Sequence, residues 1–218
     1  TINEANNLPL LLSDLLTTYK EGEIIVVDCG SEDRTIDVAN IYGAKVYRSK
    51  EKNRGLQLDI GAMNSKGEWL IFLHADTRLT HDWFRKINSV LKGDKNYIYY
   101  FKFKVNHKKM IFRVLEILVN LRSKFFKQPY GDQGLIIHKT NYFKNNGFRK
   151  IPLMEDVDFL RRLKNKKDLK QLNIPIFVSS RKWERTNIFL QALKNWNLRR
   201  RWLKGETIKS IYSDYYKK

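Results

Sequence analysis

Two aspartates follow apolar runs in the first half of the chain, where buried strands are expected to end. Asp28 closes the run at 23–28, and Asp76 lies three residues beyond the run at 69–73. In α/β proteins ligands collect at the carboxyl ends of strands, so both carboxylates are expected to face one crevice. Mg²⁺ and Mn²⁺ take oxygen ligands from one or two carboxylates and from substrate phosphates. The pair favours a site for a metal ion and a phosphorylated ligand, with Asp76 the better ligand, although a strand-end aspartate can also cap a helix.

A third group of acids lies at the predicted start of a helix, where Glu155, Asp156 and Asp158 fall within four residues. Such acids can simply stabilise the helix dipole, which is the alternative to a catalytic role. The turn at 30–35 offers backbone amides and hydroxyls after the first strand, but it matches neither the dinucleotide fingerprint nor a phosphate loop. Residue patterns alone therefore predict an α/β protein with a crevice for a metal ion and a polyanion.

The elements that must position these residues alternate along the first 94 residues. Leucines at helical spacing predict an opening helix. Beyond it, strands are predicted at 23–28, 45–48 and 69–73, and helices at 32–42, 55–64 and 81–91. This alternation predicts a three-layer α/β domain with a mostly parallel central sheet and helices on both faces.

The second half extends this architecture. Strands are predicted at 99–105, 134–138 and 174–178, and helices at 108–126, 155–163, 187–203 and from 208 onward. The last two helices form a C-terminal helical extension. A chain of 218 residues, 42% of them hydrophobic, is predicted to fold as one domain.

Cysteine and hydropathy patterns indicate a reducing environment and no membrane span. The single cysteine, Cys29, cannot form an internal disulfide, which favours the cytoplasm. No apolar stretch approaches the ~20 residues that a spanning helix requires.

The net charge of +19 is concentrated in one half of the chain. Residues 1–94 hold 12 Lys and Arg and 14 Asp and Glu, whereas residues 95–218 hold 30 and 9. A basic half indicates an anionic partner, which can be a nucleic acid, anionic lipid headgroups or a phosphorylated acceptor. The alternative is a solvated basic surface without a specific partner.

The predicted helix at 108–126 combines basic residues with an apolar stripe. The basic residues are Lys108, Lys109, Arg113, Arg122, Lys124 and Lys127, and the stripe is Ile111, Leu115, Leu118, Leu121 and Phe125. Such a helix can lie in a membrane interface, and the sequence predicts salt-sensitive association with anionic membranes. The alternative is that the stripe packs on the core.

Six segments resemble, in order and spacing, the family 2 glycosyltransferases of the GT-A fold, a Rossmann-like fold of the nucleotide-diphospho-sugar transferase superfamily. They are Thr1-Ile2-Asn3-Glu4, Asp28-Cys29-Gly30-Ser31 with Asp33 and Thr35, Arg54-Gly55 with Gln57, Leu73-His74-Ala75-Asp76-Thr77, Gly131-Asp132-Gln133-Gly134, and Leu153-Met154-Glu155-Asp156. The resemblance covers residues 1 to about 165, and Ser180-Arg181-Lys182-Trp183 resembles a subgroup feature.

The resemblance implies a role for each matching residue. Thr1 and Glu4 would line the nucleotide pocket, Asp28 would accept a hydrogen bond from a uracil base, and Asp33 and Arg54 would support the pocket. The donor site would also include Gly30, Ser31, Gly55, His74, Ala75, Asp76, Asp132, Gln133, Arg181 and Trp183. Residues 1–94 would form the nucleotide-sugar half of the domain, and residues 95–218 the acceptor half.

The implied reaction is transfer of a sugar from a UDP-sugar to a hydroxyl acceptor, with inversion at the anomeric carbon. A divalent metal ion, Mn²⁺ or Mg²⁺, held by Asp76 would neutralise the leaving diphosphate. Asp156 falls at the position of the catalytic base, which would take the proton of the acceptor hydroxyl, and Glu155 is the alternative base. The acceptor is expected to be lipid-linked or anionic, and the protein cytoplasmic, with contact at the inner face of the membrane.

Two departures from the family pattern bear on this prediction. His74 stands where the family has the first Asp of its Asp-x-Asp signature, and an imidazole ligand would favour Mn²⁺ over Mg²⁺. The chain also begins inside the first motif, so the central strand expected to precede Thr1 is not in the sequence.

Two other functions compete with transferase activity. Aromatic residues interleaved with Arg and Lys near Trp196 and Trp202 are typical of a nucleic-acid-binding surface, but this reading does not explain the strand-end acids. A basic nucleic-acid- or membrane-binding protein on the same fold, without transferase activity, is the remaining alternative.

Overall fold

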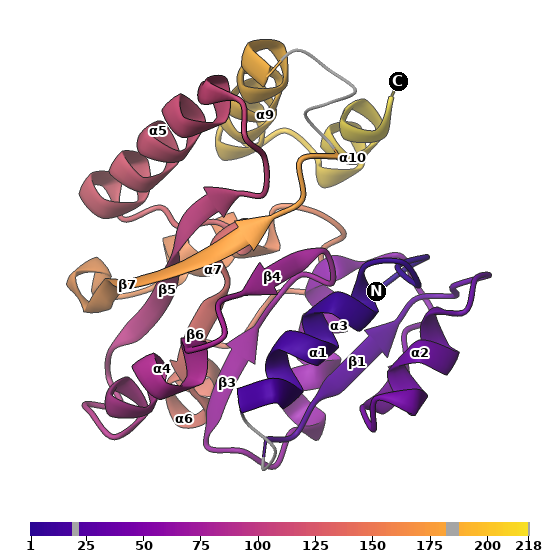
Figure 1. The fold of residues 1–218 in the computed structure, drawn as a ribbon. Coiled ribbons are helices and arrows are strands. Elements are labelled where there is room, and N and C mark those ends of the chain that lie inside the picture. Colours follow the sequence, from indigo (N-terminus) through magenta and orange to yellow (C-terminus); the bar gives the residue numbers. More distant parts are fainter. Residues whose placement is uncertain (19–21, 182–187, 218) are drawn as a thin grey trace.

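The computed structural model describes residues 1–18, 22–181 and 188–217. It begins with a unit of two parallel strands, β1 (Ile25–Asp28) and β2 (Lys45–Arg48), and three helices, α1 (Leu8–Thr18), α2 (Thr35–Ile41) and α3 (Arg54–Asn64). Leu8, Leu12, Val26, Ala39 and Ala44 form the small core of this unit. Figure 1 shows it beside the larger sheet.

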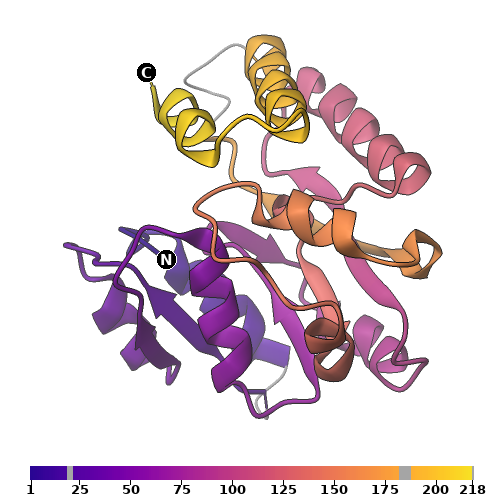
Figure 2. The same cartoon turned by 180° about the vertical axis from the view of Figure 1, so that it is seen from behind.

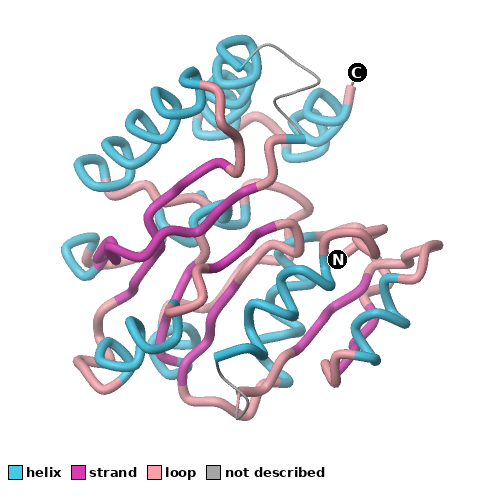
Figure 3. Tube along the Cα trace, viewed as in Figure 1, coloured by secondary structure: helices cyan, strands magenta, loops and turns pink. Residues whose placement is uncertain are grey.

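The larger sheet has five strands in the order β3, β6, β5, β7, β4. Their bounds are β3 (Trp69–Phe72), β4 (Thr77–Leu79), β5 (Ile98–Val105), β6 (Leu135–His138) and β7 (Leu169–Val178). Only β5 and β7 run parallel to each other, whereas β3–β6, β5–β6 and β4–β7 are antiparallel pairs. Figure 3 shows the strands in magenta with helices packed around them.

The α/β class with helices on both faces agrees with the sequence prediction, but the sheet is mixed instead of mostly parallel. The physical reason is that burial on both faces produces the same apolar runs in parallel and antiparallel strands. The short strand β4, which follows Asp76, and the six-residue helix α6 (Lys139–Lys144) were not predicted.

Alternate residues of β5 divide the core into two layers. Tyr99 and Phe101 pack with α1 and with α4 (Trp83–Leu91) on one face. Ile98 and Tyr100 pack on the other face, with α3, α6 and α7 (Glu155–Arg162). Figure 2 shows this second layer from behind, with α3 in purple and α7 in orange on the near face.

Three helices cover the far end of the sheet. Their bounds are α5 (Met110–Phe126), α9 (Ile188–Leu203) and α10 (Ile208–Tyr216). Phe112 and Val119 of α5 pack on Phe103 and Val178 of the sheet. Leu198 of α9 and Ile211 of α10 pack on residues at the start of α7, so the C-terminal extension lies close to the acidic cluster at 155–158. Two 3₁₀ turns, Gly131–Gln133 and Lys166–Asp168, complete the fold.

Within the described residues, none of the helices is both long enough and apolar enough to cross a membrane.

Candidate active site

The opening residues and the turn after β1 bind each other through side chains. Asp28 is fully buried at the end of β1 and accepts hydrogen bonds from the Thr1 hydroxyl at 3.1 Å and the Ser31 amide at 2.9 Å. Burial raises the pKa of Asp28, but the hydrogen bonds from Ser31 and Thr1 outweigh it, so the net pKa is lowered and the carboxylate is ionised. Gly30 supplies the left-handed backbone conformation, at φ 71°, that this turn requires.

Asp33 connects the same two loops one turn further along. Its carboxylate accepts hydrogen bonds from the amides of Ala5 and Thr35, each at 3.0 Å, and from the Thr35 hydroxyl. The Thr35 hydroxyl in turn accepts from the Glu4 amide at 2.8 Å. Gln57 of α3 donates to the Thr1 and Val27 carbonyls at 3.2 and 3.0 Å. The loops 1–5 and 30–35, which we call the donor cradle after the role that the sequence predicts for them, are therefore held together by hydrogen bonds between their own residues.

The two residues predicted to bind metal each face a guanidinium group. Nη2 of Arg181 lies 3.5 Å from Asp76 Oδ2 and 3.3 Å from Glu4 Oε2. Nε2 of His74 lies 3.1 Å from Nη2 of Arg54. Since a guanidinium only donates, His74 accepts through Nε2 and its ring carries the proton on Nδ1. In the described part of the chain, no cluster of three or more His, Cys, Asp or Glu side chains has metal-site geometry.

Arg54, at the start of α3, connects His74 to the start of α7. Its Nε lies 3.4 Å from Glu155 Oε1, and attraction to Glu155 raises the pKa of Arg54. Gly55 allows this approach, because a Cβ there would lie 1.9 Å from the Arg149 carbonyl oxygen. The Gly55 amide also donates to the Ile151 carbonyl at 3.1 Å.

Glu155 is buried, with 2% of its surface exposed. Its Oε2 has no hydrogen-bond partner among the described residues. Burial raises the pKa of Glu155 to about 7, against the lowering effect of Arg54.

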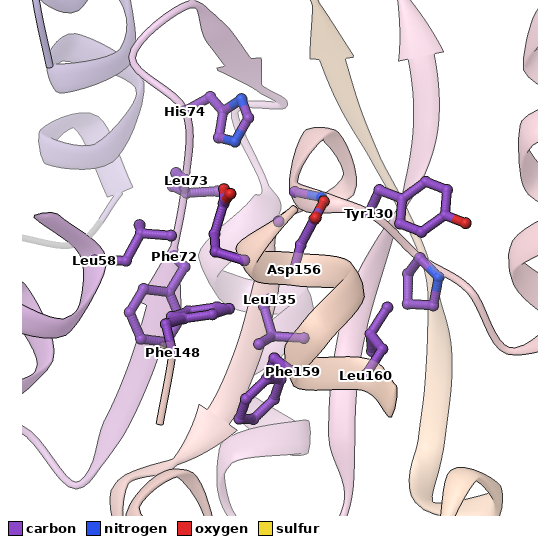
Figure 4. A pocket seen from close by; sticks show the side chains of 14 residues that line it. Leu58, Phe72, Leu73, His74, Tyr130, Leu135, Phe148, Asp156, Phe159 and Leu160 are labelled. Carbon is purple, nitrogen blue, oxygen red and sulfur yellow. The ribbon is translucent and has the colours of Figure 1, made fainter. Parts of the chain in front are cut away.

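Asp156 occupies the first turn of α7 and faces a small cavity. Its Oδ2 accepts a hydrogen bond from the Gly131 amide at 2.7 Å, and its Oδ1 accepts one from the Val157 amide at 2.7 Å. Gly131 lies between Asp156 and His74, since a Cβ on it would lie 2.9 Å from His74 Nε2 and 3.5 Å from Asp156 Oδ2. Figure 4 shows His74, Asp156 and Tyr130 above an apolar floor that includes Phe148, Phe159 and Leu160. The cavity of about 30 Å³ has room for water but not for a sugar.

Two arginines that sequence reasoning did not assign to the site converge on the ring of Tyr130. The guanidinium carbons of Arg122, on α5, and Arg199, on α9, lie 4.2 and 4.7 Å from the ring centroid. Nε and Nη2 of Arg122 are buried and lack hydrogen-bond partners among the described residues. Burial lowers the pKa of Arg122, and the charges of Asp132 and Asp156 partly offset this. The sequence placed Arg122 at lipid headgroups. In the structure its guanidinium nitrogens are buried, because Arg122 lies on the side of α5 that packs on the protein through Val119 and Ser123.

The remaining predicted residues are less directly placed at the site. Gln133 is fully buried, where its amide donates to the Phe101 carbonyl at 3.2 Å and accepts from the Ser123 hydroxyl. Ala75 packs at the edge of the first unit's core. Asp132 lies in the 3₁₀ turn next to Gln133. Trp183 lies outside the described residues. The signal that could have revealed Arg122 is a polar residue on the apolar side of a predicted helix.

Comparison with known proteins gives the same assignment over most of the chain. A family model described as glycosyl transferase family 2 matches residues 1–157. The 4,4'-diaponeurosporenoate glycosyltransferase of Staphylococcus haemolyticus is 36% identical over 87 residues, covering 37% of this chain and 23% of the relative. The cholesterol galactosyltransferase of Borreliella burgdorferi is 28% identical over 122 residues, covering 50% of this chain and 34% of the relative. The chain thus spans about a quarter to a third of the length of these relatives.

Two groups of solved structures share the fold. S. aureus TarS 1–349 in complex with UDP-GlcNAc has a TM-score of 0.65 at 16% identity, covering 82% of this chain and 56% of that one. The glucosyl-3-phosphoglycerate synthase of Mycobacterium tuberculosis in complex with UDP has a TM-score of 0.56 at 16% identity, covering 80% and 68%. These similarities confirm the predicted α/β fold.

Proposed function

The chain belongs to glycosyl transferase family 2, and on that premise we propose that it transfers a sugar from a UDP-sugar to a hydroxyl acceptor. The observation that carries this proposal is the placement of Asp156, a half-buried carboxylate at the start of α7, beside His74 and Gly131. Residues 1–94 then bind the donor, and residues 95–218 the acceptor. Both neighbouring folds described above have been crystallised with UDP or a UDP-sugar, which supports a UDP-linked donor.

In this reaction the acceptor oxygen forms a bond to the anomeric carbon while the bond from that carbon to the diphosphate oxygen breaks. Asp156 takes the proton of the acceptor hydroxyl as the new bond forms, and UDP leaves with the bonding electrons. A single displacement of this kind inverts the anomeric centre. Glu155 pairs with Arg54 through a buried contact, so it is better suited to positioning Arg54 than to accepting the proton.

For the donor, the cradle formed by loops 1–5 and 30–35 is the proposed nucleotide site. Both oxygens of Asp28 already accept hydrogen bonds from Thr1 and Ser31. Because Asp28 has no exposed surface, an arriving uracil meets the Thr1 and Ser31 hydroxyls, or moves one of them aside to reach the carboxylate. Among the described residues, Arg54 lies beside His74 and Arg181 beside Asp76, the two predicted diphosphate-binding residues.

A divalent metal ion would supply charge neutralisation for the leaving diphosphate, and one residue fits it. The Asp76 side chain is 30% exposed, and its ion pair with Arg181 at 3.5 Å is too long for a strong hydrogen bond. One carboxylate is sufficient for an ion that takes its other ligands from phosphates and water. His74 fits less well, because its Nε2 lone pair accepts from Arg54. We therefore propose Asp76 as the protein ligand and His74 as the residue that orients Arg54.

The acceptor proposed for this site is anionic or lipid-linked. Arg122 and Arg199 lie against Tyr130, which borders the same cavity as Asp156, so they can bind an acidic group on the acceptor. One relative is named for transfer to cholesterol, a membrane lipid, which supports a lipid acceptor. A lipid acceptor in turn implies that the protein works in peripheral contact with the inner face of a membrane.

The test is donor turnover without an acceptor. The full chain would be incubated with UDP-glucose, UDP-galactose and UDP-GlcNAc, with and without Mn²⁺ or Mg²⁺, and released UDP measured. We expect slow, metal-dependent release from one donor. If no donor is turned over and calorimetry detects no UDP binding, the transferase proposal fails and a binding protein on this fold is the better account.

A further inference from the structure

Helix α5 is apolar on two opposite faces, and only one of them packs on the protein. Six large apolar residues recur at helical spacing on the outer face, with exposed fractions between 45% and 78%: Met110, Val114, Ile117, Leu118, Leu121 and Phe125. The inner face carries Phe112 and Val119, which are buried. The predicted stripe therefore splits, because Ile111 and Leu115 pack on the core while Leu118, Leu121 and Phe125 lie in solvent.

Polar contacts fix which face of α5 points inward. The Glu116 carboxylate accepts from the Val105 amide at 2.8 Å, and the Asn120 side chain bonds both the amide and the carbonyl of Phe103 at 2.9 Å. The Ser123 carbonyl accepts from the buried Tyr100 hydroxyl at 3.0 Å. Rotating the helix to bury the outer stripe would break all these bonds, so the stripe stays exposed.

Helix α9 continues the exposed surface. Leu190, Leu193 and Trp196 have exposed fractions between 51% and 66%. Figures 1 and 2 both show α9 beside α5, and Ile188 at its start packs on the core cluster of Phe112 and Val119. We call the six residues of the outer α5 stripe, Phe126, and these three residues of α9 the α5–α9 face. An exposed apolar surface of this kind marks an interaction site.

Within α5 and α9, the exposed charged residues all carry a positive charge. The only acid of α5 is Glu116, which is buried and paired with Arg113 at 2.7 Å, and α9 contains no Asp or Glu. Exposed basic residues flank the face: Lys108, Lys109, Lys124, Arg200 and Lys204. The guanidinium of Arg200 lies 5.4 Å from the Trp196 ring, so an aromatic side chain and a cation are presented together.

We propose that the α5–α9 face docks on an anionic lipid bilayer. Its apolar side chains enter the boundary between headgroups and acyl chains, and the flanking Lys and Arg contact headgroup phosphates. A second copy of the chain is a poorer occupant, because two such faces meeting in a symmetric dimer would bring like charges together. The face does not depend on the proposed transferase activity. If that activity also holds, docking places Arg122, on the inner side of α5, close to the membrane from which the acceptor comes.

The test is co-sedimentation of the full chain with vesicles of phosphatidylcholine alone or with phosphatidylglycerol, at low and high salt. We expect binding only to the anionic vesicles, weakened by salt. The double variant Ile117→Glu/Leu121→Glu should weaken binding at least about tenfold, since it places two carboxylates in the apolar layer.

The matched control is Ile41→Glu/Met63→Glu, which changes two exposed apolar residues on α2 and α3 and should bind vesicles like the wild type. All four positions are exposed, and circular dichroism would verify folding. Absence of binding to anionic vesicles at low salt overturns the proposal, as does equal loss in both double variants. A dimer that the Ile117→Glu/Leu121→Glu variant dissociates, seen by sedimentation velocity without vesicle binding, would assign the face to a second copy. Donor hydrolysis in solution, measured on the same variants, reports on the transferase independently.

Discussion

Charged groups are hydrogen-bonded in the donor cradle, whereas some of those described at and near the start of α7 have buried atoms without hydrogen-bond partners. In the cradle, the carboxylates of Asp28 and Asp33 accept several hydrogen bonds each from neighbouring amides and hydroxyls. Glu155 Oε2 at the start of α7 and two nitrogens of Arg122 on α5 are buried without hydrogen-bond partners among the described residues. Buried polar groups are normally paired, so unpaired ones mark a place where a ligand or a function compensates the cost. This difference supports the proposed assignment, in which the donor side is preorganised and the acceptor side is completed by its substrate.

The largest effect is expected at Asp156, the proposed base on the acceptor side. Asp156→Asn keeps the shape of the side chain but removes the base, so transfer or donor hydrolysis should fall by roughly 10²- to 10⁴-fold. Calorimetric UDP affinity should not change, because the donor cradle is intact. Asp37→Asn, at an exposed position on α2, is the control for loss of one carboxylate. Wild-type rates in Asp156→Asn would move the base elsewhere, and a larger loss in Glu155→Gln would reverse the two roles.

The buried, partly unpaired Glu155 should make the stability of the protein depend on pH. Its pKa of about 7 lies above the ordinary value of 4.5, so between these values the folded protein binds a proton that the unfolded chain has lost. Stability therefore falls as pH rises through this window, and the penalty is fully developed above pH 7. Glu155→Gln removes this titration.

When the pH is raised from about 5 to about 8, the difference in unfolding free energy between Glu155→Gln and the wild type should shift by about 2–3 kcal/mol in favour of the variant. Urea unfolding at the two pH values measures this difference. Glu32→Gln, at an exposed position, should show no such change. A difference between wild type and Glu155→Gln that is the same at both pH values would mean that Glu155 is ionised throughout.

Asp76 tests whether the donor side needs a metal ion to complete it. In the wild type, Mn²⁺ or Mg²⁺ should tighten UDP binding, because Asp76 would hold the ion and the ion would neutralise phosphate charge. In Asp76→Ala, UDP should bind with the same affinity with and without metal, while thermal unfolding stays near that of the wild type because the side chain is partly exposed. Metal-dependent UDP affinity in the variant would exclude Asp76 as the ligand.

The smallest predicted effect is that of Arg122, which tests whether the acceptor side binds an anionic group. Arg122→Met keeps the length of the side chain but removes the buried charge. The KM for an anionic acceptor should rise roughly tenfold, the scale of one lost charge-assisted hydrogen bond, while acceptor-independent UDP release is unchanged. The unfolding free energy should not fall, because relief from burying an unpaired charge offsets the lost contact with Tyr130. Arg85→Met, exposed on α4, is the control. A loss of stability with no change in acceptor KM would make Arg122 purely structural.

Local sequence patterns were sufficient for most elements and for the order of the site motifs. Apolar runs and helical spacing located β1, β2, β3 and β5 to within a few residues. They missed β4, because three residues are too few to show a period, and they did not give the strand directions of the mixed sheet. The six motifs led to the correct family, since each depends on residue type and spacing along the chain.

The sequence by itself determined that α5 is amphipathic and basic, and that acids follow the strand ends and open α7. Only the tertiary structure decided which way these side chains point. The inner face of α5 is selected by bonds from Glu116 and Asn120 to β5, residues that lie 11 to 17 positions apart in the chain. Arg54 meets His74 and Glu155 only after α3 packs on the loop before α7. Periodicity reports the composition of each face, whereas the partner of a face is set by contacts between segments distant in sequence.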